Sequence, residues 1–429
     1  MQAVPKGGKA LQVPAAQTNF VCLLNVEDRI PKGHPIREVK RMISEVFRRL
    51  DPQFEELYAR DGRASIPPER LLGAKVLMAL YSVRSDRQFC ERLKYDLLFH
   101  WFLDLNPNER SFDASTFSKN QERLLQHHVS DLFFASVVEI AREKQWVSNE
   151  HFSADGTLIE AWASMKSFRP KDDQQGPGGG NAWMNFAGEK RSNDTHQSTT
   201  DAEAKLLKKG KGREAKLCFG AHAIMENRHG LCVHIAAHPS VGTTEAEMAL
   251  EQIDELYERG FEVSTVGADK GYHSEKFVRG CRERGIKPHV AQVEGRKVAG
   301  LDGRTAKSKG YATSQVIRRR IEELFGWMKT VGGMRKSRYR GVERTHMAVQ
   351  FCAAASNLLR MAKLATSSPP GAEVAREAPG CGAVCPGAAE RRQMGLCGPA
   401  GTLNLALFRH LRLAKPAHLL QTPLFSATC

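Results

Sequence analysis

The pattern of apolar and polar positions divides the chain into a helical part and a later part in which strands and helices alternate. From about residue 25 to 141, apolar residues recur at the three- and four-residue spacings of helices. The pair Pro67-Pro68 predicts one helix start, because proline is tolerated in a first helical turn. Ser85 caps a second, short helix, and a third opens at about 113–116. The first third of the chain is therefore predicted to be helical.

The third of these helices carries polar side chains of the kind that contact nucleic acid. The spacing of the helices is similar to that of a helix-turn-helix array, and Ser115, Lys119, Asn120 and Arg123 could contact phosphates or base edges. The alternative is a plain helical bundle with a polar outer face. Direct DNA contact by Lys119, Asn120 and Arg123 is the favoured prediction.

From His151 onward the periodicity changes to that of strands. The predicted elements are a strand at 152–159, a hairpin of 217–225 and 230–237, a helix at 245–259, a strand at 263–268, a helix at 274–284, a strand at 287–292 and a final helix. A Gly- and Pro-rich insertion and a basic segment separate the first strand from the hairpin. This order predicts an α/β domain with helices packed on a mixed sheet.

The final helix, predicted over 315–329, places three charged residues on one stripe. Arg318, Glu322 and Lys329 follow one another at spacings of four and seven residues, so at 100° per residue they share a narrow face. A carboxylate between two cations makes chemical sense if the carboxylate holds a metal and the cations hold phosphate.

The positive charge of the chain predicts an acidic binding partner. The 429 residues carry a net charge of +15, and Lys307 to Arg344 contribute eleven Lys or Arg against three Glu. A second basic cluster lies at 205–216. A solvated surface explains such concentration less well than an acidic partner, and nucleic acid is the commonest acidic partner of a soluble protein.

The cysteines and the two ends of the chain indicate the cellular compartment of the protein. The ten cysteines follow no regular framework, residues 1–20 lack the apolar core of a signal peptide, and no apolar run approaches the ~20 residues that span a bilayer. These features predict a soluble, cytoplasmic protein with free thiols. The Gly-, Ala- and Pro-rich stretch after about 364 is predicted to be a disordered tail, and its cysteines match no common zinc spacing.

Three carboxylates occupy places that this topology can bring together. Asp155 lies in the first strand, Asp269 follows the strand at 263–268, and Glu322 is on the final helix. Ligand sites in open α/β sheets gather at the carboxyl ends of strands. Oxygen ligands without nearby His or Cys favour Mg²⁺ or Mn²⁺. Two such ions about 4 Å apart can support in-line displacement at a phosphodiester.

Each carboxylate also has a simpler interpretation. Asp155 precedes glycine and could form a turn, Asp269 could cap the next segment, and Glu322 could pair with Arg318. The neighbouring Glu323 lies about 100° away from the charged stripe, which predicts a structural ion-pair role for it and favours Glu322 as the metal ligand.

The same residues carry a family resemblance. The blocks Phe152-Ser-Ala-Asp155-Gly-Thr and Val266-Gly-Ala-Asp269-Lys-Gly-Tyr, followed by Arg318, Glu322 and Lys329, resemble the DDE-class insertion-sequence transposases of the insertion-sequence-four and insertion-sequence-five supergroup. The helical part resembles the InsH-like N-terminal domain of this group. The resemblance covers about 22–364. The family commonly has a tyrosine three residues before the arginine, where this chain has Gln315.

The resemblance implies an RNase H-like mixed sheet preceded by an all-helical DNA-binding domain. It implies metal-dependent cleavage and transfer of DNA strands at terminal inverted repeats by a homodimer in a synaptic complex, with Asp155, Asp269 and Glu322 as catalytic metal ligands. The corresponding boundaries are a leader at 1–20, the helical domain at 21–147, the catalytic domain at 148–364 with a basic insertion at about 170–216, and a tail at 365–429. Alternatives are a catalytically decayed repressor that binds related elements and a general nuclease.

Overall fold

The computed structural model describes residues 25–57, 65–171, 191–208, 212, 214–239, 245–301 and 303–367. The predicted leader and most of the predicted tail lie outside these residues, as do Lys209, Lys211 and Arg213 of the second basic cluster. Among the described helices, none combines the length and apolar character needed to cross a bilayer. The cysteines of the described residues are buried free thiols, as predicted: Cys90, Cys218, Cys232, Cys281 and Cys352.

The first part of the described chain is helical, as the apolar periodicity predicted. Its helices are α1 (Val26–Arg29), α2 (Pro35–Leu57), α3 (Pro68–Leu80), α4 (Asp86–Arg92), α5 (Leu97–Phe102), α6 (Ala114–Gln126) and α7 (Val129–Glu143). The starts of α4 and α6 follow from capping side chains, since Ser85 accepts from the Gln88 N–H and Asp113 accepts from the N–H groups of Ser115 and Thr116. The caps explain why the sequence located α4 and α6 closely.

The second part is a mixed sheet flanked by helices. Its elements are β1 (His151–Glu160), β2 (Phe168–Pro170), β3 (His196–Ser198), β4 (Lys205–Lys208), β5 (Ala215–Glu226), β6 (Leu231–His238), α8 (Glu245–Glu258), β7 (Thr265–Ala268), α9 (Glu275–Glu283), β8 (Lys287–Val290), α10 (Gly303–Ala306), α11 (Lys309–Ile317), α12 (Arg320–Thr330) and α13 (Val342–Ser367). The main sheet runs β4-β5-β1-β7-β8, and β6 pairs with β5. β1 pairs antiparallel with β5 and parallel with β7, which in turn pairs parallel with β8. The predicted mixed α/β fold is confirmed.

The region expected to be an insertion contains strands that the sequence did not predict. β4 extends the main sheet by pairing with β5, and β2 and β3 form a small antiparallel sheet of their own. These strands have three or four residues each, too few to produce a readable alternation.

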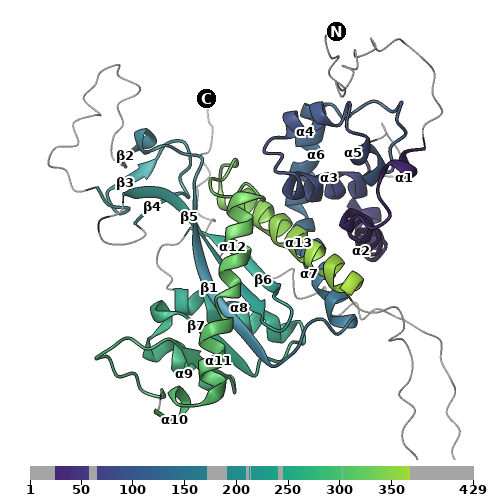
Figure 1. Cartoon of the computed structure of the whole chain (residues 1–429). Helices are drawn as coiled ribbons and strands as arrows, with labels where there is room; N and C mark the ends of the chain where they lie inside the picture. Colours follow the sequence, from purple (N-terminus) through teal and green to yellow (C-terminus); the bar gives the residue numbers. More distant parts are fainter. Residues whose placement is uncertain are drawn as a thin grey trace, which may run out of the picture.

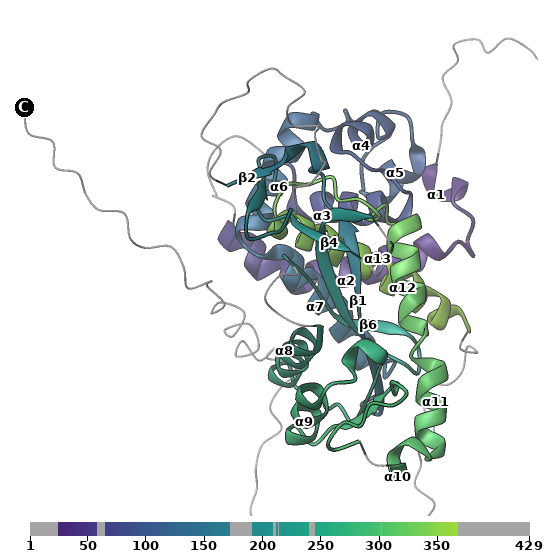
Figure 2. The ribbon, with the colours of Figure 1, turned by 90° about the vertical axis from the view of Figure 1, so that its left-hand side faces the viewer.

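The two faces of the sheet carry different helices. Figure 2 shows α8 and α9 on one side of the sheet and α11 and α12 on the other. Lys329 of α12 donates a hydrogen bond to Thr157 Oγ1, so the α12 side is the face to which Asp155, two residues earlier on β1, also projects. The core on the other face includes the buried residues Phe152 and Ala154.

Helix α13 joins the two parts of the molecule. In Figure 1 it runs between the N-terminal helices and β6. Asn357 of α13 hydrogen-bonds to both backbone groups of Cys232 on β6, and the ring of Phe351 packs against that of Phe133 on α7, tilted by 41° with centroids 5.4 Å apart. One hydrophobic core therefore runs through both parts, across the boundary predicted at residue 147.

A polar chain also crosses this junction through Asp131 of α7. His346 of α13 accepts a hydrogen bond at Nδ1 from the Ala237 N–H of β6 and therefore donates from Nε2 to Asp131 Oδ1, at 3.0 Å. Burial would raise the pKa of Asp131, but hydrogen bonds from His128, His346 and Gln350 hold it well below its usual value.

This pairing predicts a pH-dependent contribution to stability. Because the folded-state pKa is lowered, the contribution is fully present above the unfolded pKa near 3.8 and is lost as the pH falls through that value toward the folded one. Asp131→Asn should lower the free energy of unfolding by about 2 kcal/mol at pH 6. Urea unfolding at pH 6 and pH 3.5 should show the gap between the two proteins narrowing at the lower pH. A gap that stays constant would contradict the assignment.

Candidate functional site

Two strands and one helix carry the three predicted carboxylates, which come from β1, the end of β7 and α12. Asp155 lies in the middle of β1, opposite Ala223 of β5, so the simpler interpretation of a turn at Asp155 is wrong. Asp269 directly follows β7, where its Oδ1 accepts from the Gly271 N–H at 2.7 Å. The capping role considered for Asp269 is therefore real and does not conflict with a position at the carboxyl end of the strand. Glu322 is exposed on α12.

The charges of neighbouring carboxylates act on Asp155. Burial raises the pKa of Asp155 to about 6, against a lowering hydrogen bond from the Gly156 N–H. The negative charges of Asp269, Glu245 and Glu322 raise it further. An interaction of this kind requires proximity, and a cation placed among the carboxylates would relieve it.

Asp155, Asp269 and Glu322 offer carboxylate oxygens, the type of ligand that a hard divalent cation prefers. Within the described residues, no three His, Cys, Asp or Glu side chains lie close enough to hold one metal ion. The buried hydroxyl of Tyr272 lacks a hydrogen-bond partner among these residues and feels the charges of Glu245, Asp155 and Asp269. An oxygen ligand among these groups would satisfy it.

The helix that carries Glu322 differs from the prediction. A single helix was expected over 315–329, but α11 ends at Ile317 and α12 begins at Arg320. The intervening Arg318 and Arg319 keep right-handed helical angles, and the N–H groups of Ile321 and Glu322 bond three residues back to their carbonyls. The chain tightens here by one 3-10-like turn, which shifts Arg318 relative to Glu322.

Arg318 is held by Gln315 rather than by Glu322. Arg318 Nε donates to Gln315 Oε1 at 2.9 Å, and Gln315 Nε2 donates to the His289 carbonyl of β8 at 2.6 Å. Within the described residues Arg318 and Glu322 form no ion pair. Gln315, which stands where the resemblance expects a tyrosine, thus connects the sheet to the guanidinium.

The neighbouring Glu323 faces another direction. Its Oε2 lies 3.8 Å from Arg360 Nη1 on α13, in agreement with the structural ion-pair role predicted for it. Glu322 and Glu323 therefore form a natural pair for comparison, since the charge of Glu322 acts on Asp155 while Glu323 lies near Arg360.

The predicted DNA contacts on α6 are not all available. Lys119 and Arg123 are exposed, as is Ser115. Asn120 is 7% exposed, accepts from Ser65 Oγ at 2.8 Å and donates to the Thr116 carbonyl. Because both ends of its amide are used inside the protein, the structure argues against Asn120 as a DNA contact.

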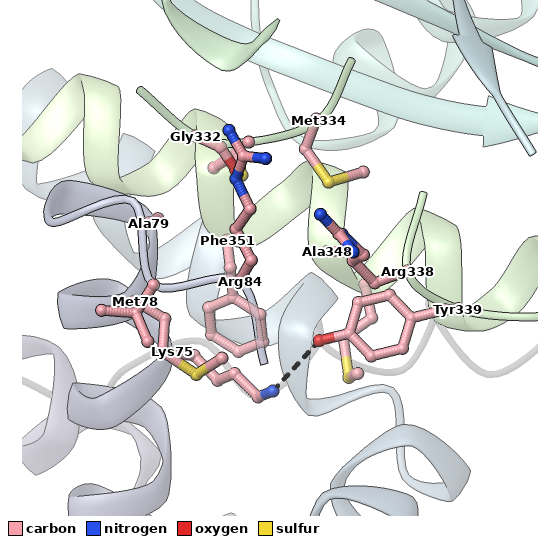
Figure 3. Close-up of a pocket in the computed structure, with 14 residues that line it drawn as sticks. Lys75, Met78, Ala79, Arg84, Gly332, Met334, Arg338, Tyr339, Ala348 and Phe351 are labelled. Carbon is pink, nitrogen blue, oxygen red and sulfur yellow. Dashed lines mark hydrogen bonds between the residues drawn. The ribbon is translucent and has the colours of Figure 1, made fainter. Parts of the chain in front are cut away.

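A small cavity of about 60 Å³ lies apart from the carboxylates, between α3, the segment 332–339 and α13. Figure 3 shows Lys75 directed toward Tyr339, whose hydroxyl is 3.3 Å from Lys75 Nζ. Lys75 also contacts Asp86 at 3.2 Å. Burial opposes the charged form, yet Tyr339 and Asp86 hold the pKa of Lys75 above its usual value. This buried contact joins α3 to the segment after α12.

The sequence did not single out Glu245 or Tyr272. Glu245 begins the helix predicted at 245–259, and Tyr272 is the last residue of the block around Asp269 that resembles the family. The juxtaposition of Asp269, Gly271 and Tyr272 within one short motif was the only available signal.

Two family models match the chain. One, described as a transposase domain (DUF772), matches residues 24–123, and the other, described as a transposase DDE domain, matches residues 190–358. A search of curated proteins finds no match.

Among solved structures, one similar chain is described as a piggyBac transposase synaptic complex with hairpin DNA, with a TM-score of 0.36, 11% identity and coverage of 77% of this chain and 76% of that one. Another is a Mos1 transposase paired-end complex with the left transposon end, with a TM-score of 0.18, 10% identity and coverage of 67% and 87%. Similarities this low carry no argument about this chain.

Proposed function

We propose that this chain, a DDE transposase of the insertion-sequence-four and insertion-sequence-five type, acts on the ends of an insertion sequence. It would cut and transfer DNA strands at the terminal inverted repeats. The observation that carries the proposal is that the charges of Asp269, at the end of β7, and Glu322, on α12, both act on the half-buried Asp155 of β1. In an RNase H-like arrangement these would be the catalytic carboxylates.

In this proposal Asp155, Asp269 and Glu322 hold Mg²⁺ or Mn²⁺. A bound pair of such ions would supply an activated attacking oxygen and stabilise the leaving oxygen. The protein contributes position, because Asp155 is fixed by a strand paired on both sides and Asp269 by its cap on Gly271. Pre-set ligands avoid reorganisation during the reaction.

Basic side chains around β1, the strand of Asp155, support a DNA backbone contact. Lys329 reaches Thr157 on β1, and the segment after α12 returns to the end of β1 through a 2.7 Å bond from the Ser337 N–H to the Glu160 carbonyl. This segment carries the exposed residues Arg335, Arg338 and Arg340. We propose that they, with Arg318 and Lys329, hold phosphates near the scissile bond, and that Lys119 and Arg123 contact DNA from α6.

The other parts of the proposal follow from the resemblance. The protein would act as a homodimer on two transposon ends and on target DNA, in the cytoplasm at the nucleoid. The helical region over 21–147 would recognise DNA, and 148–364 would carry catalysis. α13 would belong to both, since it packs against α7 and β6.

The deciding experiment uses duplex DNA with the inverted repeats that flank the gene. The purified protein should nick or cut this duplex only when Mg²⁺ or Mn²⁺ is added. A decayed repressor would give a shifted band in electrophoresis and no product in any metal. A general nuclease would cut a scrambled duplex equally well, and either result would overturn the proposal.

Gln315 offers a narrower prediction. Gln315→Ala removes the link between the His289 carbonyl and Arg318, and we expect about tenfold slower cleavage because a misplaced phosphate ligand weakens positioning. Thr313→Ala, on the exposed side of the same helix, is the matched control. The single-turnover cleavage rate is measured for both variants. Equal rates would show that Gln315 does not position Arg318 for cleavage.

A further inference from the structure

A fourth carboxylate approaches the site from the other face of the sheet. Glu245 is the first residue of α8, which packs on the side opposite α11 and α12 (Figure 2). Its charge acts on Asp155 and Tyr272, and burial together with the charge of Asp269 raises its own pKa.

Gly271 keeps a small space open between Glu245 and Asp269. A methyl group placed on Gly271 would lie 3.0 Å from Asp269 Oδ1 and 3.3 Å from Glu245 Oε2. The two carboxylate oxygens therefore face the same point, and any side chain larger than hydrogen would crowd both of them. Like charges facing one small space are unfavourable unless something positive lies near them.

Tyr272, the next residue, supplies an independent sign of a ligand. Its side chain is fully buried, and its hydroxyl has no hydrogen-bond partner in the described part of the chain. Glu245, Asp155 and Asp269 all lie close enough to act on this hydroxyl. A buried hydroxyl left without a partner costs about 1–3 kcal/mol, so native proteins rarely leave one.

We infer that Glu245 is a further ligand residue of the divalent-cation site and that the Tyr272 hydroxyl donates a hydrogen bond to an oxygen held there. The inference rests on the proposed function for the identity of the cation, Mg²⁺ or Mn²⁺. The oxygen belongs to a carboxylate or to water bound among Glu245, Asp155 and Asp269. In this arrangement β1, the end of β7 and α12 supply carboxylates from one face of the sheet, and α8 supplies one from the other.

The first test measures binding of Mn²⁺ alone to the full-length protein, without DNA, by the electron paramagnetic resonance signal of free Mn²⁺. Glu245→Gln should weaken binding by about tenfold, because it removes one charge from the ligand set. Glu251→Gln removes a charge from an exposed position on the same helix and should bind Mn²⁺ like the wild type. Equal affinities for Glu245→Gln and wild type would show that Glu245 serves only the start of α8.

The second test uses thermal unfolding of Tyr272→Phe, which keeps the ring and removes only the hydroxyl. Without metal, the variant should melt at or above the wild-type temperature, since no hydrogen bond to the described residues is lost. Saturating Mn²⁺ should raise the melting temperature of the wild type more than that of Tyr272→Phe. If Mn²⁺ raised the melting temperature equally in both proteins, the Tyr272 hydroxyl would have no part in the cation site.

These outcomes separate the inference from the proposed function. If wild-type protein cuts repeat-bearing DNA with Mn²⁺ while Glu245→Gln binds Mn²⁺ normally, only the role of Glu245 fails. If wild-type protein does not cut in any metal, the proposed function fails whatever Glu245 does to Mn²⁺ affinity.

Discussion

Glu322→Gln is expected to slow metal-dependent strand cleavage by about a thousandfold, whereas Glu323→Gln, one residue away, leaves the rate within about twofold. The reason is geometric. Glu322 adds to the negative charge around Asp155, while Glu323 lies on another side of α12, near Arg360. Losing a metal ligand costs several kcal/mol of transition-state stabilisation, and each 1.36 kcal/mol is about tenfold in rate.

The measurement is single-turnover cleavage of a duplex that carries the terminal repeat, with binding followed separately by mobility shift. Binding should survive in both variants, because the proposed DNA contacts are the basic residues. Asp155→Asn and Asp269→Asn should behave like Glu322→Gln. A fully active Glu322→Gln protein, or an equally impaired Glu323→Gln protein, would refute the assignment of the third carboxylate.

Phe351→Ala is expected to lower the free energy of unfolding by about 3–5 kcal/mol, the usual range for removing a buried phenylalanine. Phe351 is 3% exposed and packs against Phe133, so its loss opens a cavity between α13 and α7. The free energy should fall for the whole described fold, because one core spans the helical part and the sheet.

Chemical denaturation monitored by tryptophan fluorescence and by circular dichroism tests this expectation. Both probes should follow one transition, shifted to lower denaturant in Phe351→Ala. Lys363→Ala, at an exposed position of the same helix, should change stability by less than about 0.5 kcal/mol. Two separated transitions, with only one moved by the substitution, would mean that the helical part and the sheet unfold independently.

Much of the fold could be predicted because its elements have strong local signals. The hairpin predicted at 217–225 and 230–237 corresponds to β5 and β6, and the capping residue Ser85 located α4. The short strands β2 to β4 escaped prediction because pairing with neighbours, rather than an alternating pattern, defines them. The prediction did not describe α13, which is apolar on most sides and lacks a clear amphipathic stripe.

The candidate site was predictable where residues sit in recognisable blocks. Asp155 and Asp269 are placed by single strands, so the sequence around each was sufficient. The failures depended on three-dimensional neighbours. Asn120 was predicted to be a surface amide, but its oxygen accepts a hydrogen bond from Ser65. Glu245 could be recognised as a site residue only in three dimensions, where α8 approaches Gly271. The periodicity of one segment cannot predict contacts between segments that are far apart in the sequence.

The position of α13 has a consequence for how the protein is made. Helices α2, α3 and α7 leave the ribosome long before residues 342–367, yet they bury part of their apolar surface against that late helix. We therefore expect the nascent helical region to complete its packing only after residues 342–367 have been translated. We expect a chain interrupted before residue 342 to be less stable, because the helical part would lose the apolar surface that α13 covers.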